Sequence, residues 1–259
     1  MVPSGVYAEL MSFFGYVLAG LGVGVVFGMF GAGGSAFATP VLALLGVPGL
    51  LAVASPLPAM VPAAFMGARR FLESGNLDRR VARLAILGGV PGTLLGALGS
   101  PVVGGDRLLV LSGLLLLAIG ARLLMPDRSG ASGRAADRLK STWVVVGSAF
   151  GVGLLTGLLA NGGGFLLVPL FVLVLGLTAV RAAGTSMVVV GVLTIPTLAT
   201  HWVLGNIDWI VAAGFAIGLI PASLVGARLA QEVSPARSRL AFGAMLVGFS
   251  SWFLVRQLT

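Results

Sequence analysis

Two glycine-rich stretches interrupt long apolar runs in this chain: "GAGGSAFATP" (residues 31–40) and "NGGGFLLVP" (residues 161–169). Gly33 lies seven residues before Pro40, and Gly162 lies seven residues before Pro169. Glycine frees the backbone, and proline removes a helical N–H and clashes with the preceding turn. The sequence therefore predicts two helices broken at matching points in the two halves of the chain.

The composition around these stretches is that of a membrane protein. The 259 residues are 58% hydrophobic and only 9% charged, whereas a soluble domain carries about 25% charged residues. A helix of about 20 apolar residues crosses the hydrocarbon layer, where only helices and closed barrels satisfy the backbone. Because the apolar runs are continuous rather than alternating, we predict an all-α polytopic membrane protein.

Other features narrow the class. No Lys or Arg precedes the first apolar stretch, so a cleaved secretory signal is not expected. The chain has no cysteine, which excludes disulfides, thiol catalysis and cysteine-ligated metals. The net charge of +8 comes from arginines clustered between apolar stretches. This pattern indicates membrane orientation rather than nucleic-acid binding. We predict no metal and no cofactor.

The two halves match beyond the glycines. "GNLD" at 75–78 matches "GNID" at 205–208 with an offset of 130, as do Pro91 and Pro221. The glycine–proline blocks match at 129, so one single-residue gap reconciles them. Each half is predicted to hold five apolar segments: 11–30, 34–48, 51–68, 84–102 and 108–125, then 143–160, 163–178, 182–203, 209–227 and 240–257. Since five is odd, the second repeat is expected to be inverted.

The arginines give an independent indication of inversion. The "GNLD" loop is flanked by arginines at 69, 70, 79, 80 and 83, whereas its counterpart contains Asp208, follows His201 and has no Lys or Arg. Under the positive-inside rule the two loops face opposite sides. We therefore expect a first membrane repeat over 1–125, a cytoplasmic linker over 126–140, and an inverted second repeat over 141–259.

Inverted repeats with broken helices are the architecture in which transporters hold a substrate near the membrane midplane. Glycine runs expose backbone N–H groups, and a helix N-terminus attracts anions. The candidate substrate-binding residues in these blocks are Gly33, Gly34, Ser35, Thr39, Asn161, Gly162, Gly163 and Gly164. The alternative is that the glycines only allow close helix packing.

The chain resembles the TauE/SafE sulfite-exporter family over nearly its whole length. The resemblance rests on the two glycine–proline blocks and on the small-residue steps that follow them. "AAGTSMVVV" at 182–190 fits the family pattern, whereas "VASPLPAMV" at 53–61 keeps Ser55 but has Pro56 where a second serine is expected. The resemblance implies an exporter of sulfite or organosulfonates in the bacterial inner membrane, working by alternating access. Ser55, Thr185 and Ser186 become further substrate-binding candidates, and membrane lipid is the expected surrounding partner.

His201 is the last candidate substrate-binding residue, with an interfacial histidine as the alternative. By our placement all eight acidic residues fall in termini, loops or segment ends, which argues against strong proton coupling. Rival functions are an anion channel, a structural membrane protein, and an intramembrane serine hydrolase using Ser35 or Ser186 with His201. The sequence leaves open which anion is carried, which ion drives transport, and whether two copies pair.

Overall fold

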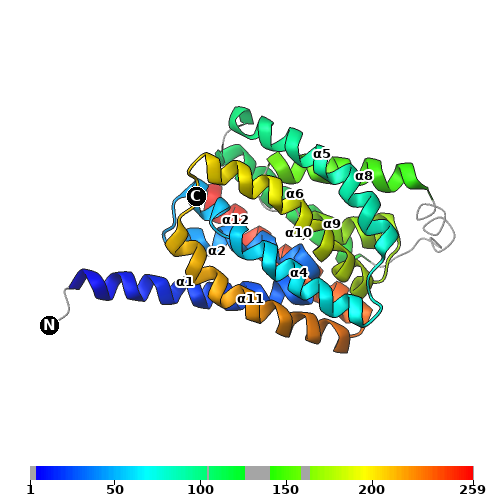
Figure 1. Cartoon of the computed structure of the whole chain (residues 1–259), viewed down its shortest axis with the longest axis horizontal. Helices are drawn as coiled ribbons and strands as arrows, with labels where there is room; N and C mark the ends of the chain where they lie inside the picture. The colour runs from blue at the N-terminus through cyan, green and yellow to red at the C-terminus, as the bar shows by residue number, and fades with distance from the viewer. Residues whose placement is uncertain (1–3, 104, 126–140, 159–163, 259) are drawn as a thin grey trace.

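The computed structural model describes residues 4–103, 105–125, 141–158 and 164–258, and over these residues the chain forms helices and no strands (Figure 1). Six stretches are long and apolar enough to cross a membrane: 10–29, 49–73, 79–99, 179–203, 209–232 and 236–256. The chain is therefore a multi-pass helical membrane protein. The predicted linker over 126–140 lies outside the described residues.

The first half contains α1 (Ser4–Met29), the 3-10 helix η1 (Gly31–Phe37), α2 (Ala38–Leu44), α3 (Gly49–Ala54), α4 (Leu57–Glu73), α5 (Arg79–Val103) and α6 (Gly105–Leu124). The second half contains α8 (Thr142–Leu158), α9 (Gly164–Pro169), the π-helical turn η2 (Leu170–Val174), α10 (Ala179–Val203), α11 (Trp209–Glu232) and α12 (Pro235–Leu258). The described residues of the glycine–proline blocks thus form short 3-10 and α segments, and a π segment follows the second block.

Two helix pairs each join one half of the chain to the other. Helix α1 packs along α11, and α5 packs along α8 (Figure 1). Glycines permit both contacts: a Cβ on Gly28 would overlap the Ser223 carbonyl oxygen, and one on Gly157 would overlap the Thr93 carbonyl oxygen. Gly28 and Gly157 are related by the offset of 129, and Thr93 and Ser223 by 130. Matching glycines therefore make matching contacts.

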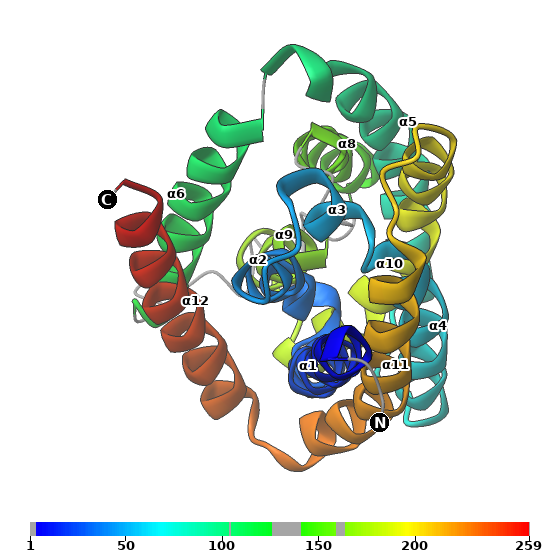
Figure 2. The same cartoon turned by 90° about the vertical axis from the view of Figure 1, so that its left-hand side faces the viewer.

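The glycine-rich segments lie near the centre of the bundle. In the end-on view α2 and α9 are in the middle, α6 and α12 are on one side, and α4, α5, α10 and α11 are on the other (Figure 2). Segment η1 contacts α1, α9 and α10. Its residues Ala36 and Phe37 are buried, as are Leu166 and Leu167 of α9. Large apolar side chains therefore surround the polar groups of these segments.

One predicted segment, 51–68, is divided in the structure into α3 and α4. Pro56 and Pro58 cannot donate the helical N–H bonds that would join the two helices. The matching helix α10 has Ser186 and Val188 at these positions and runs without interruption from Ala179 to Val203. The departure from the family pattern at Pro56 thus changes the backbone locally.

The "GNLD" and "GNID" turns have the same construction. Gly75 and Gly205 have φ values of +72° and +69°, a region that favours glycine. The carboxylates of Asp78 and Asp208 each accept two backbone N–H bonds, which caps α5 and α11 respectively. Helix α5 therefore begins at Arg79, five residues before the start of the predicted segment at 84.

Candidate functional site

The best-defined part of the candidate site is Ser35 in η1. This side chain is 1% exposed, and its hydroxyl has no hydrogen-bond partner among the described residues. Segment η1 enters this position through Gly31, whose φ of +68° is left-handed. A Cβ on Gly31 would meet Ala183 and the Ser186 hydroxyl of α10, so no larger residue fits there. Ser35 is thus held where the two halves of the chain meet.

The other residues of the two glycine blocks are placed in part. Gly33 and Gly34 lie within η1, Thr39 is buried in α2, and Gly164 begins α9. Asn161, Gly162 and Gly163 lie outside the described residues. Pro40 occupies the first turn of α2, where a helix needs no N–H donor from it. The residues leading into α2 form the 3-10 helix η1. The first backbone N–H groups of such a helix have no carbonyl acceptor within the helix itself.

Ser186 lies beside this segment, but its hydroxyl proton is already used. The hydroxyl donates to the Ala183 carbonyl oxygen at 2.9 Å, one turn back on α10. This is the local bonding that serine commonly makes in membrane helices. Ser186 therefore has no second proton to donate to an anion while this bond is made.

Thr185 and Ser55 make tertiary hydrogen bonds that the sequence reasoning missed. The Asp78 N–H donates to the Thr185 hydroxyl at 3.0 Å, and the Asp208 N–H donates to the Ser55 hydroxyl at 3.0 Å. Both hydroxyl side chains are fully buried. Each bond ties a "GN(L/I)D" turn of one half to the other half. The signal was the offset of 130, which relates Ser55 to Thr185 and Asp78 to Asp208.

His201 lies in the last turn of α10 and is 6% exposed. Its Nδ1 is 3.3 Å from the Asn206 side-chain nitrogen in the "GNID" turn, beside the paired rings of Trp202 and Trp209. Fifteen residues of one helix separate it from Ser186, about 22 Å at 1.5 Å per residue. The two cannot form a serine–histidine pair.

Within the described part of the chain, no three His, Asp or Glu side chains are grouped to hold a metal.

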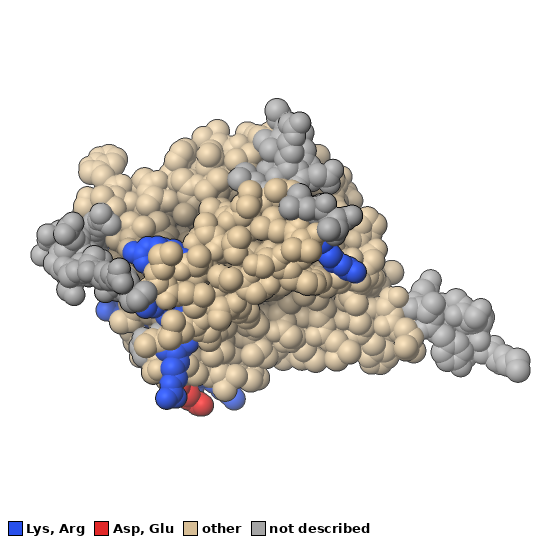
Figure 3. All heavy atoms as spheres, turned by 180° about the vertical axis from the view of Figure 1, so that it is seen from behind, with Lys and Arg blue, Asp and Glu red and all other residues tan. Residues whose placement is uncertain are grey.

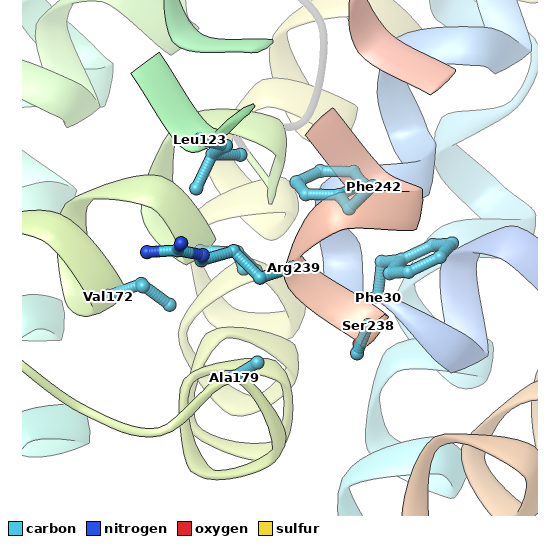
Figure 4. Close-up of a pocket in the computed structure, with 8 residues that line it drawn as sticks. Phe30, Leu123, Val172, Ala179, Ser238, Arg239 and Phe242 are labelled. Atoms are coloured by element: carbon cyan, nitrogen blue, oxygen red, sulfur yellow. The ribbon is translucent and has the colours of Figure 1, made fainter. Parts of the chain in front are cut away.

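A cavity of about 20 Å³ lies beside the glycine segments (Figure 4). Phe30, immediately before η1, and Val168 of α9 help to line it, and Ser238 and Arg239 are its polar members. A cavity of this size holds at most one water molecule. A sulfonate does not fit in it, so this cavity is not the proposed anion site.

The site lies among buried segments of a multi-pass helical protein, as in transporters. The chain belongs to the sulfite exporter TauE/SafE family, whose family model matches residues 16–253. A "Probable membrane transporter protein" of Xylella fastidiosa (strain 9a5c) is 28% identical over 242 residues, covering 90% of this chain and 92% of that protein. "Probable membrane transporter protein YunE" of Bacillus subtilis (strain 168) is 23% identical over 247 residues, covering 86% and 89%. No solved structure matches the chain. The protein is therefore a membrane transporter of this family.

Proposed function

We propose that the protein exports small sulfur-containing anions, sulfite or organosulfonates, across the bacterial inner membrane. It does so by alternating access, with one anion site between two inverted repeats. The description of its family names sulfite, and the names of its relatives specify transport without a substrate. The observation that carries the proposal on this chain is the buried Ser35 hydroxyl.

An unpaired buried hydroxyl is costly, by about 1–3 kcal/mol. Ser35 bears that cost next to Gly33 and Gly34 of η1, two residues that have no side chain of their own to cover the backbone. An oxyanion would accept hydrogen bonds from the Ser35 hydroxyl and from the first backbone N–H groups of the 3-10 helix. Since α2 has only seven residues, the proposal rests on these individual donors rather than on a helix dipole. Asn161 to Gly164 supply the matching donors from the second repeat.

The inverted arrangement is supported by contacts at matched positions. The hydrogen bonds Asp78–Thr185 and Asp208–Ser55 are equivalent under the offset of 130, and each crosses between the halves. The α1–α11 and α5–α8 pairs are equivalent in the same way. Such an arrangement favours two alternative conformations in which the halves exchange roles.

The test measures binding and transport by purified protein. A thermal-shift screen of sulfite, sulfonates, carboxylates and phosphate identifies the anion, and proteoliposomes measure its saturable counterflow. Ser35→Ala is expected to weaken binding about fivefold to tenfold, the equivalent of one lost hydrogen bond. The matched control is Ser250→Ala, because Ser250 is equally buried and donates to its own helix at Leu246. If Ser35→Ala binds the anion as tightly as the wild type, the site lies elsewhere.

A further inference from the structure

A second cavity lies between α4 and α11, at the edge of the bundle (Figure 2). Its volume is about 180 Å³, and its lining is Met66, Arg69, Arg70, Glu73, Leu224 and Arg228. The lining includes three guanidinium groups and one carboxylate, so it carries an excess of two positive charges. Residues from both halves of the chain contribute to it. Such a lining suits an oxyanion, because several guanidinium groups can each donate hydrogen bonds to its oxygens.

The charges of this cavity are incompletely compensated. Arg69 pairs with Glu73 at 3.0 Å, one turn apart on α4. Neither Arg70 nor Arg228 pairs with a carboxylate among the residues that the structure describes. Two exposed guanidinium groups are thus available to a ligand. The face drawn in Figure 3 shows most of its basic side chains gathered at one end of the molecule.

Apolar side chains continue from the cavity along the same two helices. Met66 of α4, which also lines the cavity, is 41% exposed, and Ile217 and Val225 of α11 are 58% and 49% exposed. These residues precede the arginines in both helices, so they lie on the side of the cavity toward the middle of the bundle. The surface therefore combines a cationic end with an apolar strip, which matches a phospholipid headgroup and its acyl chains.

Packing of the helices does not require these arginines. Under the offset of 130, Arg69, Arg70 and Arg228 correspond to Ala199, Thr200 and Leu98. Helix α5 contacts α10 at that matching place just as α11 contacts α4, without any of the three charges. The three arginines are thus present at the α4–α11 contact and absent from the matching α5–α10 contact.

We propose that this cavity binds the phosphate of one anionic phospholipid. Arg70 and Arg228 contact the phosphate oxygens, Arg69 and Glu73 form the rim, and the acyl chains lie along the exposed side chains of α4 and α11. Basic pockets between transmembrane helices hold anionic headgroups by this chemistry. The site is separate from the proposed substrate site, because α4 and α11 lie at the edge of the bundle whereas α2 and α9 lie in its middle (Figure 2).

The experiment titrates the purified protein, in a neutral detergent, with phosphatidylglycerol and with phosphatidylcholine, and counts bound lipid by native mass spectrometry. One phosphatidylglycerol is expected to bind more tightly than phosphatidylcholine. Arg228→Gln and Arg70→Gln are each expected to weaken it about fivefold, and the double variant about 25-fold. The control is Arg79→Gln, a neighbouring exposed arginine outside the cavity lining, with an expected change below about twofold. Each variant's melting temperature without lipid verifies its fold.

Two results would overturn the assignment. If Arg79→Gln weakens phosphatidylglycerol binding as much as Arg228→Gln does, the lipid responds to the general charge of that face and no defined site exists. If inorganic phosphate at millimolar concentration displaces the lipid and raises the melting temperature equally, the cavity holds a soluble oxyanion. Neither result depends on whether the protein exports sulfite.

Discussion

The hydrogen bond between the Asp78 N–H and the Thr185 hydroxyl predicts a measurable defect when the hydroxyl is removed. The bond spans 107 residues of sequence and joins the turn before α5 to the buried face of α10. Valine has nearly the shape of threonine but no hydroxyl. Thr185→Val therefore leaves the fold's packing intact and leaves the Asp78 N–H without its acceptor.

The expected cost is that of an unpaired, partly buried N–H group, about 1–3 kcal/mol. If the turn opens locally, amide exchange at Asp78 accelerates by the same free energy, about fivefold to about 150-fold. Hydrogen–deuterium exchange of a peptide covering 75–81 measures this directly. The same change made at the matching place, Ser55→Ala, is expected to accelerate exchange at Asp208 in the second turn, since that N–H donates to Ser55 at 3.0 Å.

Two variants separate the tertiary bond from a general effect. Thr185→Ser keeps the acceptor oxygen and is expected to restore protection at Asp78. Ser186→Ala removes the neighbouring hydroxyl, whose bond is to Ala183 of its own helix, and is expected to leave the turn protected. Unchanged exchange at Asp78 in a folded Thr185→Val protein would show that this bond does not hold the turn.

Three further predictions use other contacts. A cysteine introduced within 75–80 is expected to label only from the cytoplasm and one within 204–208 only from outside, in a chain that has no native cysteine; labelling of both from one face contradicts the inverted repeat. Gly157→Ala is expected to destabilise the α5–α8 pair by about 1–3 kcal/mol, because its methyl group would overlap the Thr93 carbonyl. Gly151→Ala on the same helix has nothing within 4 Å and is expected to be neutral or stabilising in the same denaturation assay, and equal losses would contradict the packing argument. Sulfonate export from liposomes is expected to follow an imposed membrane potential, worth about 2.3 kcal/mol per charge at 100 mV. A flux that follows a pH gradient at zero potential would instead indicate proton coupling.

Much of the fold could be predicted from the sequence because continuous apolar runs indicate membrane-spanning helices. The helix ends depend on local capping residues, which the sequence also contains. Asp78 caps α5 and Asp208 caps α11. Because of its cap, α5 begins at Arg79, before its apolar part. The division between α3 and α4 follows from Pro56 and Pro58, whose missing N–H groups carry more weight than the apolar character of that segment. The 3-10 geometry of η1 was not predicted, because glycine permits several backbone conformations.

The site was harder to predict because its contacts join distant parts of the chain. Ser55 and Asp208 are 153 residues apart, and no local pattern around either residue indicates that they meet. In the structure the hydroxyl oxygens of Ser55 and Thr185 accept backbone N–H bonds, and a substrate contact of either residue stays a prediction. The shared offset of 130 relates the two bonds to each other, but it does not by itself predict either of them.

The chemistry of the interior fits the proposed cargo. Among the described residues, the buried polar side chains are serines, threonines and His201, with no Asp, Glu, Lys or Arg. A buried arginine would bind an anion strongly, but it would leave an unpaired charge in the empty carrier, which costs several kcal/mol. Neutral donors such as Ser35 avoid that cost in the empty state and still provide hydrogen bonds to sulfonate oxygens. A carrier must return empty after release, so weak neutral donors in the interior, with the arginines kept out of it, favour turnover over tight retention.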